Sequence, residues 1–207
     1  MNMLTRRTLL IASLATAALF TRFGGVAPAR AQSADQAAAF VNQTGQALVG
    51  VVNGPAPTAD KRAQLQAIVD RAVDVDEVAR FCLGRYWRTT PPEQQKQYLQ
   101  LFHQVLSNNI TGKLGEYKGV TFTLGRAQAR DGGVSVDTVV TRPGSAPTAV
   151  AWIVSNASGS PRIIDIVAEG TSLRLTQRSD YGSYLSHNNN NVQALLEAMR
   201  RQVSAPG

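Results

Sequence analysis

Residues 120–168, VTFTLGRAQARDGGVSVDTVVTRPGSAPTAVAWIVSNASGSPRIIDIVA, decide the fold of this chain. Apolar and polar side chains alternate in four runs of this stretch, and a period of two predicts β-strands. Short segments at 130–133, 143–145 and 158–161 separate the runs and are rich in Gly, Pro, Asp and Ser. Connections this short predict an antiparallel meander of four strands.

Helical spacing of apolar residues replaces the period of two on both sides of this stretch. Before it, the pattern predicts four helices. Asp74 followed by Glu77 predicts the N-cap of the third, and one apolar stripe from Tyr98 to Tyr117 marks the fourth, long helix. After it, the pattern predicts helices over residues 171–187 and 192–203. The order helices, strands, helices predicts one α+β domain over residues 32–207.

The first 31 residues have the three parts of an export signal. An arginine pair at positions 6 and 7 precedes a 12-residue apolar run, Leu9–Phe20, and Ala29-Arg30-Ala31 forms a small-x-small cleavage site. A membrane span needs about 20 apolar residues, so this run is too short for a permanent anchor. The pattern predicts a twin-arginine signal peptide cleaved after Ala31, with the general secretory route as the alternative, and a free periplasmic protein.

Most of the formal charge of +7 lies on this signal segment, which holds four arginines and no acid. Its removal leaves 17 Lys+Arg against 14 Asp+Glu, with no basic run beyond Arg200-Arg201. Tight binding to nucleic acid needs a clustered basic surface, because each contact neutralises a phosphate. The small excess and the export signal therefore exclude nucleic acid as a partner.

Catalytic constellations are missing from the sequence. His103 and His187 are the only histidines, and neither has Cys, Asp or Glu at the spacing of a metal site. Cys82, the single cysteine, lies between Phe81 and Leu83 and is predicted to be a buried hydrophobe rather than a nucleophile. No phosphate loop or dinucleotide fingerprint is present. The sequence predicts a protein that is not an enzyme and carries no cofactor or metal.

Two separated segments resemble one protein family. Residues 73–88, VDVDEVARFCLGRYWR, have the acidic-apolar start and the LG-aromatic-W-R end of the periplasmic phospholipid-binding MlaC family, also called the toluene-tolerance auxiliary family. Residues 165–173, DIVAEGTSL, resemble that family's D-x-x-x-EG-x-S-hydrophobic segment, and Arg178-Ser179 stands where the family has its RS pair. Ile110 and Gln177 depart from the family, because many members have tyrosine there.

The resemblance implies a soluble carrier whose curved four-stranded antiparallel sheet and helices enclose an apolar cavity, like the cone of nuclear transport factor with a helical subdomain. Its cargo would be a phospholipid, carried between an inner-membrane ABC complex with a mammalian-cell-entry domain and an outer-membrane lipoprotein complex. Two alternatives stay open. One is a carrier of a hopanoid or other polycyclic lipid, for which the departures from tyrosine leave room. The other is a non-catalytic structural or interaction domain.

The resemblance also selects candidate site residues from the apolar strand face, the long helix and the first family-like segment. For such residues, periodicity alone favours a packed core over a cavity wall. The candidate lipid-binding residues are Phe81, Trp87, Phe102, Val105, Leu106, Ile110, Leu114, Phe122, Val136, Val150, Trp152, Ile164 and Ile166. Because the planar guanidinium suits phosphate and carboxylate groups, Arg85, Arg88 and Arg178 are candidates for a headgroup or partner surface, with ordinary surface ion pairs as the alternative.

Overall fold

The computed structural model describes residues 28–112 and 114–204. Most of the predicted signal segment, residues 1–27, lies outside the described residues, and the predicted cleavage site at Ala31 lies within the first helix. The elements are α1 (Pro28–Asn53), α2 (Thr58–Ala72), α3 (Val75–Leu83), η1 (Gly84–Thr89), α4 (Pro92–Gly112), η2 (Leu114–Tyr117), β1 (Thr121–Arg130), β2 (Gly133–Thr141), β3 (Thr148–Ser155), β4 (Arg162–Ala168), β5 (Thr171–Ser172), α5 (Leu173–His187) and α6 (Val192–Ser204).

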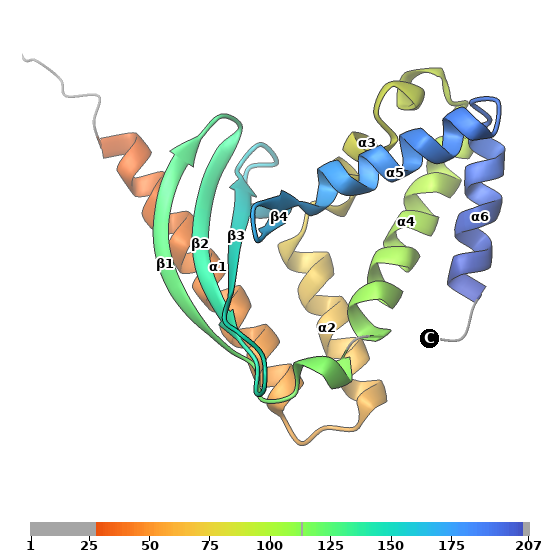
Figure 1. The fold of residues 1–207 in the computed structure, drawn as a ribbon. Coiled ribbons are helices and arrows are strands. Elements are labelled where there is room, and N and C mark those ends of the chain that lie inside the picture. Colours follow the sequence, from red (N-terminus) through yellow and green to blue (C-terminus); the bar gives the residue numbers. More distant parts are fainter. Residues whose placement is uncertain (1–27, 113, 205–207) are drawn as a thin grey trace, which may run out of the picture.

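Figure 1 shows two regions of the molecule on either side of α2. The sheet half consists of β1 to β5 and α1, and the helical half consists of α3, η1, α4, α5 and α6. Helix α2 contacts α1 and β4 on one side and α4 on the other. Helices lie on both sides of the sheet, because α1 packs on β1 and β2 while α5 extends from β5 and packs against β4 and α3. The predicted α+β class is confirmed.

The five strands form one open antiparallel sheet in the order β1-β2-β3-β4-β5. The four predicted strands are confirmed, and β5 adds two residues that pair with the end of β4. Glu169 and Gly170 connect β4 to β5 with positive φ angles of 50° and 80°, as a tight hairpin turn requires. A strand of two residues is too short to produce an alternating pattern, so the sequence does not reveal it.

The predicted hairpin at 130–133 is confirmed, since β1 ends at Arg130 and β2 begins at Gly133. Gly132 has a φ of +80°, which glycine adopts without steric cost. Gly133 is required for a different reason: a Cβ there would collide with the carbonyl oxygen of Val154 on β3. The turn therefore fixes the register of β1 with β2. Its second glycine also allows the start of β2 to lie close to β3.

One face of the sheet is apolar, and α1 covers part of it. The register sets Val136 opposite Trp152 and Trp152 opposite Ile166, so the three side chains share this face. Val41 of α1 is buried in a cluster with Val136. On the opposite face Val139 is 43% exposed, which fits the polar side of a half-covered sheet.

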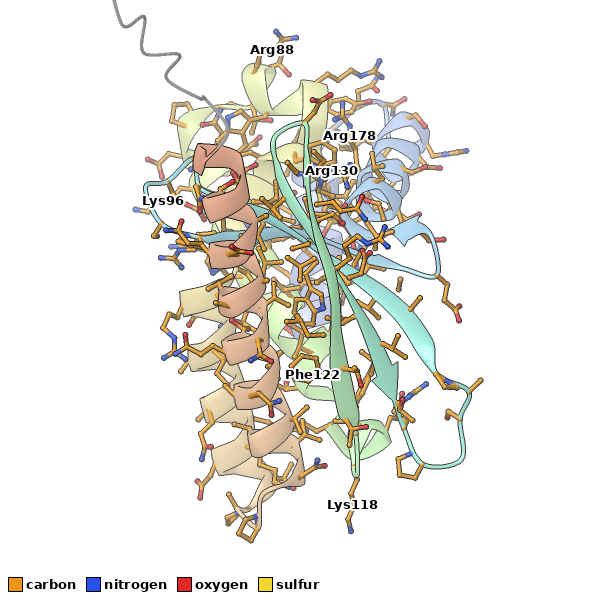
Figure 2. All side chains as sticks on the ribbon, turned by 90° about the vertical axis from the view of Figure 1, so that its left-hand side faces the viewer. Arg88, Lys96, Lys118, Phe122, Arg130 and Arg178 are labelled. Carbon is orange, nitrogen blue, oxygen red and sulfur yellow. The ribbon has the colours of Figure 1, made fainter. Side chains whose placement is uncertain are left out.

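Close packing of α1 on β1 depends on one glycine. A Cβ on Gly45 would lie 2.6 Å from the ring of Phe122, so the ring lies directly against the helix backbone. Figure 2 shows Phe122 between α1 and β1. The long helix α4 lies in the other half of the molecule. It packs mainly against α2, α3 and α6, and its Tyr98 and Phe102 rings contact Tyr181 of α5.

The helical half has its own core, which is rich in aromatic rings. Tyr98 is fully buried, with its ring 5.9 Å from Phe102 and 6.2 Å from Tyr181 between centroids. Its hydroxyl donates to the Ala79 carbonyl at 2.8 Å, so the buried oxygen has a partner. The predicted burial of Cys82 in this core is confirmed.

One prediction for α4 is wrong. The apolar stripe of the fourth predicted helix is expected to continue through Tyr117, but α4 ends at Gly112 and Leu114 begins the separate 3-10 turn η2. Glycines at 112 and 115 weaken a helix by about 1 kcal/mol each relative to alanine, which favours a stop at this point. Leu114 is half-buried there.

Candidate functional site

Twelve of the thirteen candidate lipid-binding residues fall into two groups in the structure, rather than one, and Leu114 lies apart in η2. Phe102 and Val105 are buried in the helical half, and four further candidates pack partly buried against that core: Phe81, Trp87, Leu106 and Ile110. In the sheet half, Val136 is buried under α1, with Trp152 partly buried beside it. Phe122 lies on Gly45 at the edge of that contact. Two apolar regions therefore carry the candidates, each with its own packed core.

Part of the apolar sheet face, on β3 and β4, lies beyond the contact with α1. Helix α1 packs on β1 and β2, and Val150, Trp152 and Ile166 farther across the sheet are only half-buried. Ile164 lies deeper, with 4% of its surface exposed. Half-buried branched and aromatic side chains on one sheet face leave apolar area in contact with water, which costs about 25 cal/mol per Å². This part of the face is the candidate for covering an apolar ligand.

A hydrogen-bonded threonine lies within this apolar face. Thr138 on β2 is buried, and its hydroxyl donates to the Val150 carbonyl at 2.9 Å. The same oxygen accepts from the indole Nε1 of Trp152 at 2.9 Å. Both polar groups are satisfied, and the indole is held across β2 and β3. The sequence contains a weak signal for this arrangement, because a threonine interrupts the inward-facing valines of β2.

The first family-like segment, residues 73–88, joins the two halves. Its Asp74 accepts from the Glu77 amide at 3.0 Å, which confirms the predicted N-cap of α3. The Asp74 amide donates to the Ile163 carbonyl at 3.0 Å, so the start of α3 is tied to β4. Burial raises the pKa of the Cys82 thiol from 9.0 to about 12, which opposes the reactive thiolate form. These contacts hold the fold together.

The second family-like segment, residues 165–173, makes a similar connection. Asp165 is buried and accepts from the Ser172 hydroxyl at 2.6 Å and from the Arg174 amide at 3.1 Å. The Ser172 oxygen also accepts from the Leu175 amide at 3.2 Å, so it caps α5. An ion pair joins Arg174 Nε to Asp165 at 3.6 Å. The segment fixes the start of α5 against β4.

The three candidate arginines lie in the helical half, in different surroundings. Arg178 is stacked on Phe81 with 4.9 Å between the guanidinium carbon and the ring centroid. Arg85 lies 4.9 Å from the Tyr86 ring and donates to its hydroxyl at 2.9 Å. Arg88 is exposed. Figure 2 shows Arg88 and Arg178 toward the same end of the molecule, opposite Lys118.

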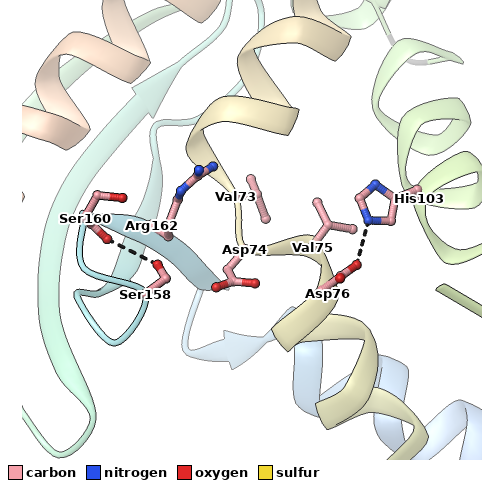
Figure 3. Close-up of a pocket in the computed structure, with 8 residues that line it drawn as sticks. All are labelled: Val73, Asp74, Val75, Asp76, His103, Ser158, Ser160 and Arg162. Carbon is pink, nitrogen blue, oxygen red and sulfur yellow. Dashed lines mark hydrogen bonds and ion pairs between the residues drawn. The ribbon is translucent and has the colours of Figure 1, made fainter. Parts of the chain in front are cut away.

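Two surface pockets adjoin Asp76 and His103, whose side chains approach to 3.0 Å between Oδ1 and Nε2. One pocket, of about 430 Å³, lies where the α2–α3 connection meets the β3–β4 turn, and Figure 3 shows its polar lining. The other, of about 870 Å³, lies along α4 and includes Trp87 and Leu99. Of the candidate lipid-binding residues, Trp87 lines the second pocket, and none lines the first.

Among residues 28–112 and 114–204, no group of three or more His, Cys, Asp or Glu side chains is close enough to hold a metal ion. The helices of this described part are also too short or too polar to cross a membrane. The geometry thus defines an α+β domain with a partly uncovered apolar sheet face.

Comparison with known proteins places this domain in a family. Residues 42–201 match the family model "MlaC protein", and the chain belongs to the MlaC family. Among curated proteins, it is similar to the toluene tolerance protein Ttg2D of Pseudomonas putida, with 23% identity over 142 residues. That match covers 68% of this chain and 66% of the relative, so the chain spans slightly less than two thirds of the relative's length.

A solved structure shares the fold. It is a phospholipid-binding protein from Ralstonia solanacearum in complex with a phospholipid, and it superposes with a TM-score of 0.71 at 21% identity. The likeness covers 82% of this chain and 97% of that protein. At this identity the similarity establishes the common fold.

Proposed function

We propose that this protein is a soluble periplasmic carrier that shields the acyl chains of one phospholipid and moves it between membrane complexes. Membership in the MlaC family supports this function, as does the fold shared with a protein solved with a phospholipid bound. The observation that carries the proposal is the apolar face of β3 and β4, where Val150, Trp152 and Ile166 stay half-buried beside the packed cluster under α1.

The energetics of the cargo fit such a surface. Burying a methylene is worth about 0.8 kcal/mol, so leaving roughly thirty methylenes of two acyl chains in water costs more than 20 kcal/mol. A carrier must cover nearly all of them. We place the chains on the half-buried side chains of β3 and β4, with the outer stripe of α4 at Leu106 and Ile110 as a second wall. Phe102, Val105 and Val136 then belong to the packed cores because they are already buried.

The polar end of the lipid requires a different surface. Arg85, Arg88 and Arg178 are our candidates for contacts with the headgroup or with partner proteins, since a guanidinium binds phosphate through two parallel hydrogen bonds. The partners proposed are an inner-membrane ABC complex with a mammalian-cell-entry domain and an outer-membrane lipoprotein complex. Charge reversal at exposed Arg88 should weaken transfer to a partner in a liposome-linked assay and leave lipid loading unchanged.

We expect residues 1–31 to direct export of the protein. The periplasmic location requires removal of this segment, and we expect the exported protein to begin at Gln32. N-terminal sequencing of protein recovered from the periplasm tests this expectation. A precursor that stays uncleaved in the membrane fraction would contradict it.

Native mass spectrometry of the purified mature protein tests the proposed cargo. One two-chain phospholipid per protein supports the proposal. A bound hopanoid or other polycyclic lipid would replace it with the alternative carrier. A protein that has no lipid and takes up none from vesicles would overturn both and leave a structural domain.

A pair of variants on the two faces of the sheet sharpens this test. Ile166→Asp places a charge on the half-buried apolar face and should abolish lipid loading while the protein stays folded. Val139→Asp places the same charge on the opposite face, where the side chain is 43% exposed, and should leave loading unchanged. A folded Ile166→Asp protein that still carries lipid would reject our assignment of this face.

A further inference from the structure

Thr138 interrupts an apolar pattern at a buried position. The other inward-facing residues of β2 are Val134, Val136 and Val140, and valine has nearly the shape of threonine. Thr138 is only 2% exposed, so its hydroxyl is cut off from water. A buried hydroxyl without a partner destabilises the folded state, and a valine would avoid that cost. Packing alone therefore does not explain why this position is a threonine and not a valine.

The two hydrogen-bond partners of the hydroxyl explain the threonine. Its hydrogen goes to the Val150 carbonyl and its oxygen accepts the indole N–H of Trp152, each at 2.9 Å. Thr138 and Val150 are directly opposite in the register, whereas Trp152 is opposite Val136. The indole consequently lies diagonally across the β2–β3 pair, with its polar atom anchored and its ring fixed. A buried tryptophan N–H needs such a partner.

The fixed indole lies at a boundary on the apolar face. On one side it packs against the cluster that Val41 of α1 forms with Val136 and Val154. On the other side are Val150 and Ile166, which α1 leaves half-buried. An apolar chain that lies on the uncovered part of the face meets this ring before it meets the packed cluster. A ring that is held by a hydrogen bond cannot move aside without losing that bond.

We propose that Thr138 is a positioning residue that fixes the Trp152 indole as the end wall of the acyl-chain site and so limits the length of the bound chain. The inference rests on the proposed function, because it concerns the same apolar face. Hydrophobic pockets discriminate one methylene by about 10- to 200-fold, so a rigid end wall selects chain length strongly. A mobile indole would select weakly.

Native mass spectrometry of lipids bound to wild type, Thr138→Val and Trp152→Phe tests the proposal. Thr138→Val keeps the shape of the side chain and frees the indole, and Trp152→Phe keeps a ring without an N–H. Both should broaden the acyl-chain distribution toward longer chains, by about two methylenes or more. Thr138→Ser retains the hydroxyl and should restore the wild-type distribution. Thr176→Val, which removes an exposed hydroxyl bonded to the Ser172 carbonyl, is the matched control and should change nothing.

A spectroscopic measurement tests the position of the wall directly. In a Trp87→Phe background Trp152 is the remaining tryptophan, and vesicle phospholipids brominated at different chain positions are the quenchers. Quenching should be strongest with bromine near the terminal methyl group. Equal or absent quenching at all positions would overturn the proposal.

Different results would refute the carrier function and the role of Thr138. A wild-type protein without phospholipid would refute the carrier function itself. A loaded wild type whose chain lengths match those of folded Thr138→Val and Trp152→Phe would leave the carrier intact and reduce the hydrogen bond to a stabilising contact. If Thr138→Val does not fold, Trp152→Phe and the quenching profile decide the outcome.

Discussion

The helical half and the sheet half of this molecule bury their apolar side chains in different ways. In the helical half, Tyr98, Phe102 and Tyr181 form a ring cluster buried among side chains of α3, α4, α5 and α6, and the Tyr98 hydroxyl has a backbone partner. In the sheet half, the smaller cluster under α1 consists mainly of alanine and valine, and the apolar face continues beyond it without complete cover. The core of the helical half is filled by the chain itself, whereas the apolar face of the sheet half continues beyond its packed cluster.

This difference assigns separate roles to the two halves. A core closed by its own side chains gains nothing from a ligand, whereas half-buried apolar surface gains about 25 cal/mol for each Å² that a ligand covers. The family-like segments at 73–88 and 165–173 lie at the junctions between the halves and fix their relative position. We therefore expect the buried ring cluster of the helical half to act as a scaffold, so that changes at Tyr98, Phe102 or Tyr181 alter stability without altering cargo.

The largest effect is expected for a charge in the packed part of the sheet half. Val136 is 0% exposed beneath α1, so Val136→Asp buries a carboxylate without a partner. We expect a loss of more than about 4 kcal/mol, comparable with the whole stability of a small domain, and an unfolded or aggregated product. Circular dichroism and size-exclusion chromatography measure this. A folded, soluble variant would show that Val136 borders an accessible cavity.

Alkaline pH should act selectively on the helical half. Burial raises the pKa values of Cys82, Tyr98 and Tyr181, all of which lie in this half. Since each folded pKa exceeds the unfolded one, the contribution is complete below pH 9.0 and is lost as the pH rises toward about 12 for Cys82. The loss reaches about 1.4 kcal/mol per pH unit for each group.

Single-tryptophan variants separate the two halves in this titration, because Trp87 lies in the helical half and Trp152 in the sheet half. Fluorescence of Trp87 should change at a lower pH than that of Trp152. Simultaneous changes would mean that the halves unfold as one unit. Cys82→Ala should shift the Trp87 transition to higher pH.

Gly45→Ala should loosen α1 from β1. The added Cβ would lie 2.6 Å from the Phe122 ring, and overpacking of this kind costs about 1–3 kcal/mol. Urea unfolding measures the loss. Combining it with Phe122→Leu, which shortens the opposing side chain, should recover part of the stability. Equal losses in the single and double variants would show that the contact is not the cause.

The smallest effect is expected at the junction of the halves. Asp74→Ala removes the side-chain acceptor for the Glu77 amide and should cost about 1 kcal/mol. The backbone bond from the Asp74 amide to Ile163 remains, so the two halves stay connected. Asp74→Asn, which also caps helices well, serves as the control. Lipid loading should be unchanged in both variants.

Local patterns predicted much of the fold. The alternation in residues 120–168 gave the four long strands, and the glycines at 132 and 133 marked their first turn. The Asp74 cap and the burial of Cys82 were also visible in the sequence. These features depend on neighbours a few positions apart. The two-residue strand β5 was missed because it is too short to alternate, and the stop of α4 was missed because the apolar spacing continues past Gly112 to Leu114 and Tyr117.

The sequence by itself determined which residues are apolar, most of the helices and the four long strands that they form, and which segments resemble the MlaC family. Only the tertiary structure decided how these elements pair: α1 rather than α4 covers the strand face, and the candidate residues divide between two cores. Periodicity predicts that a side chain points away from water, but it does not predict which residues that side chain contacts. Close contacts such as Gly45 with Phe122, and Thr138 with Trp152, join positions far apart in the chain, and only the folded chain brings them together.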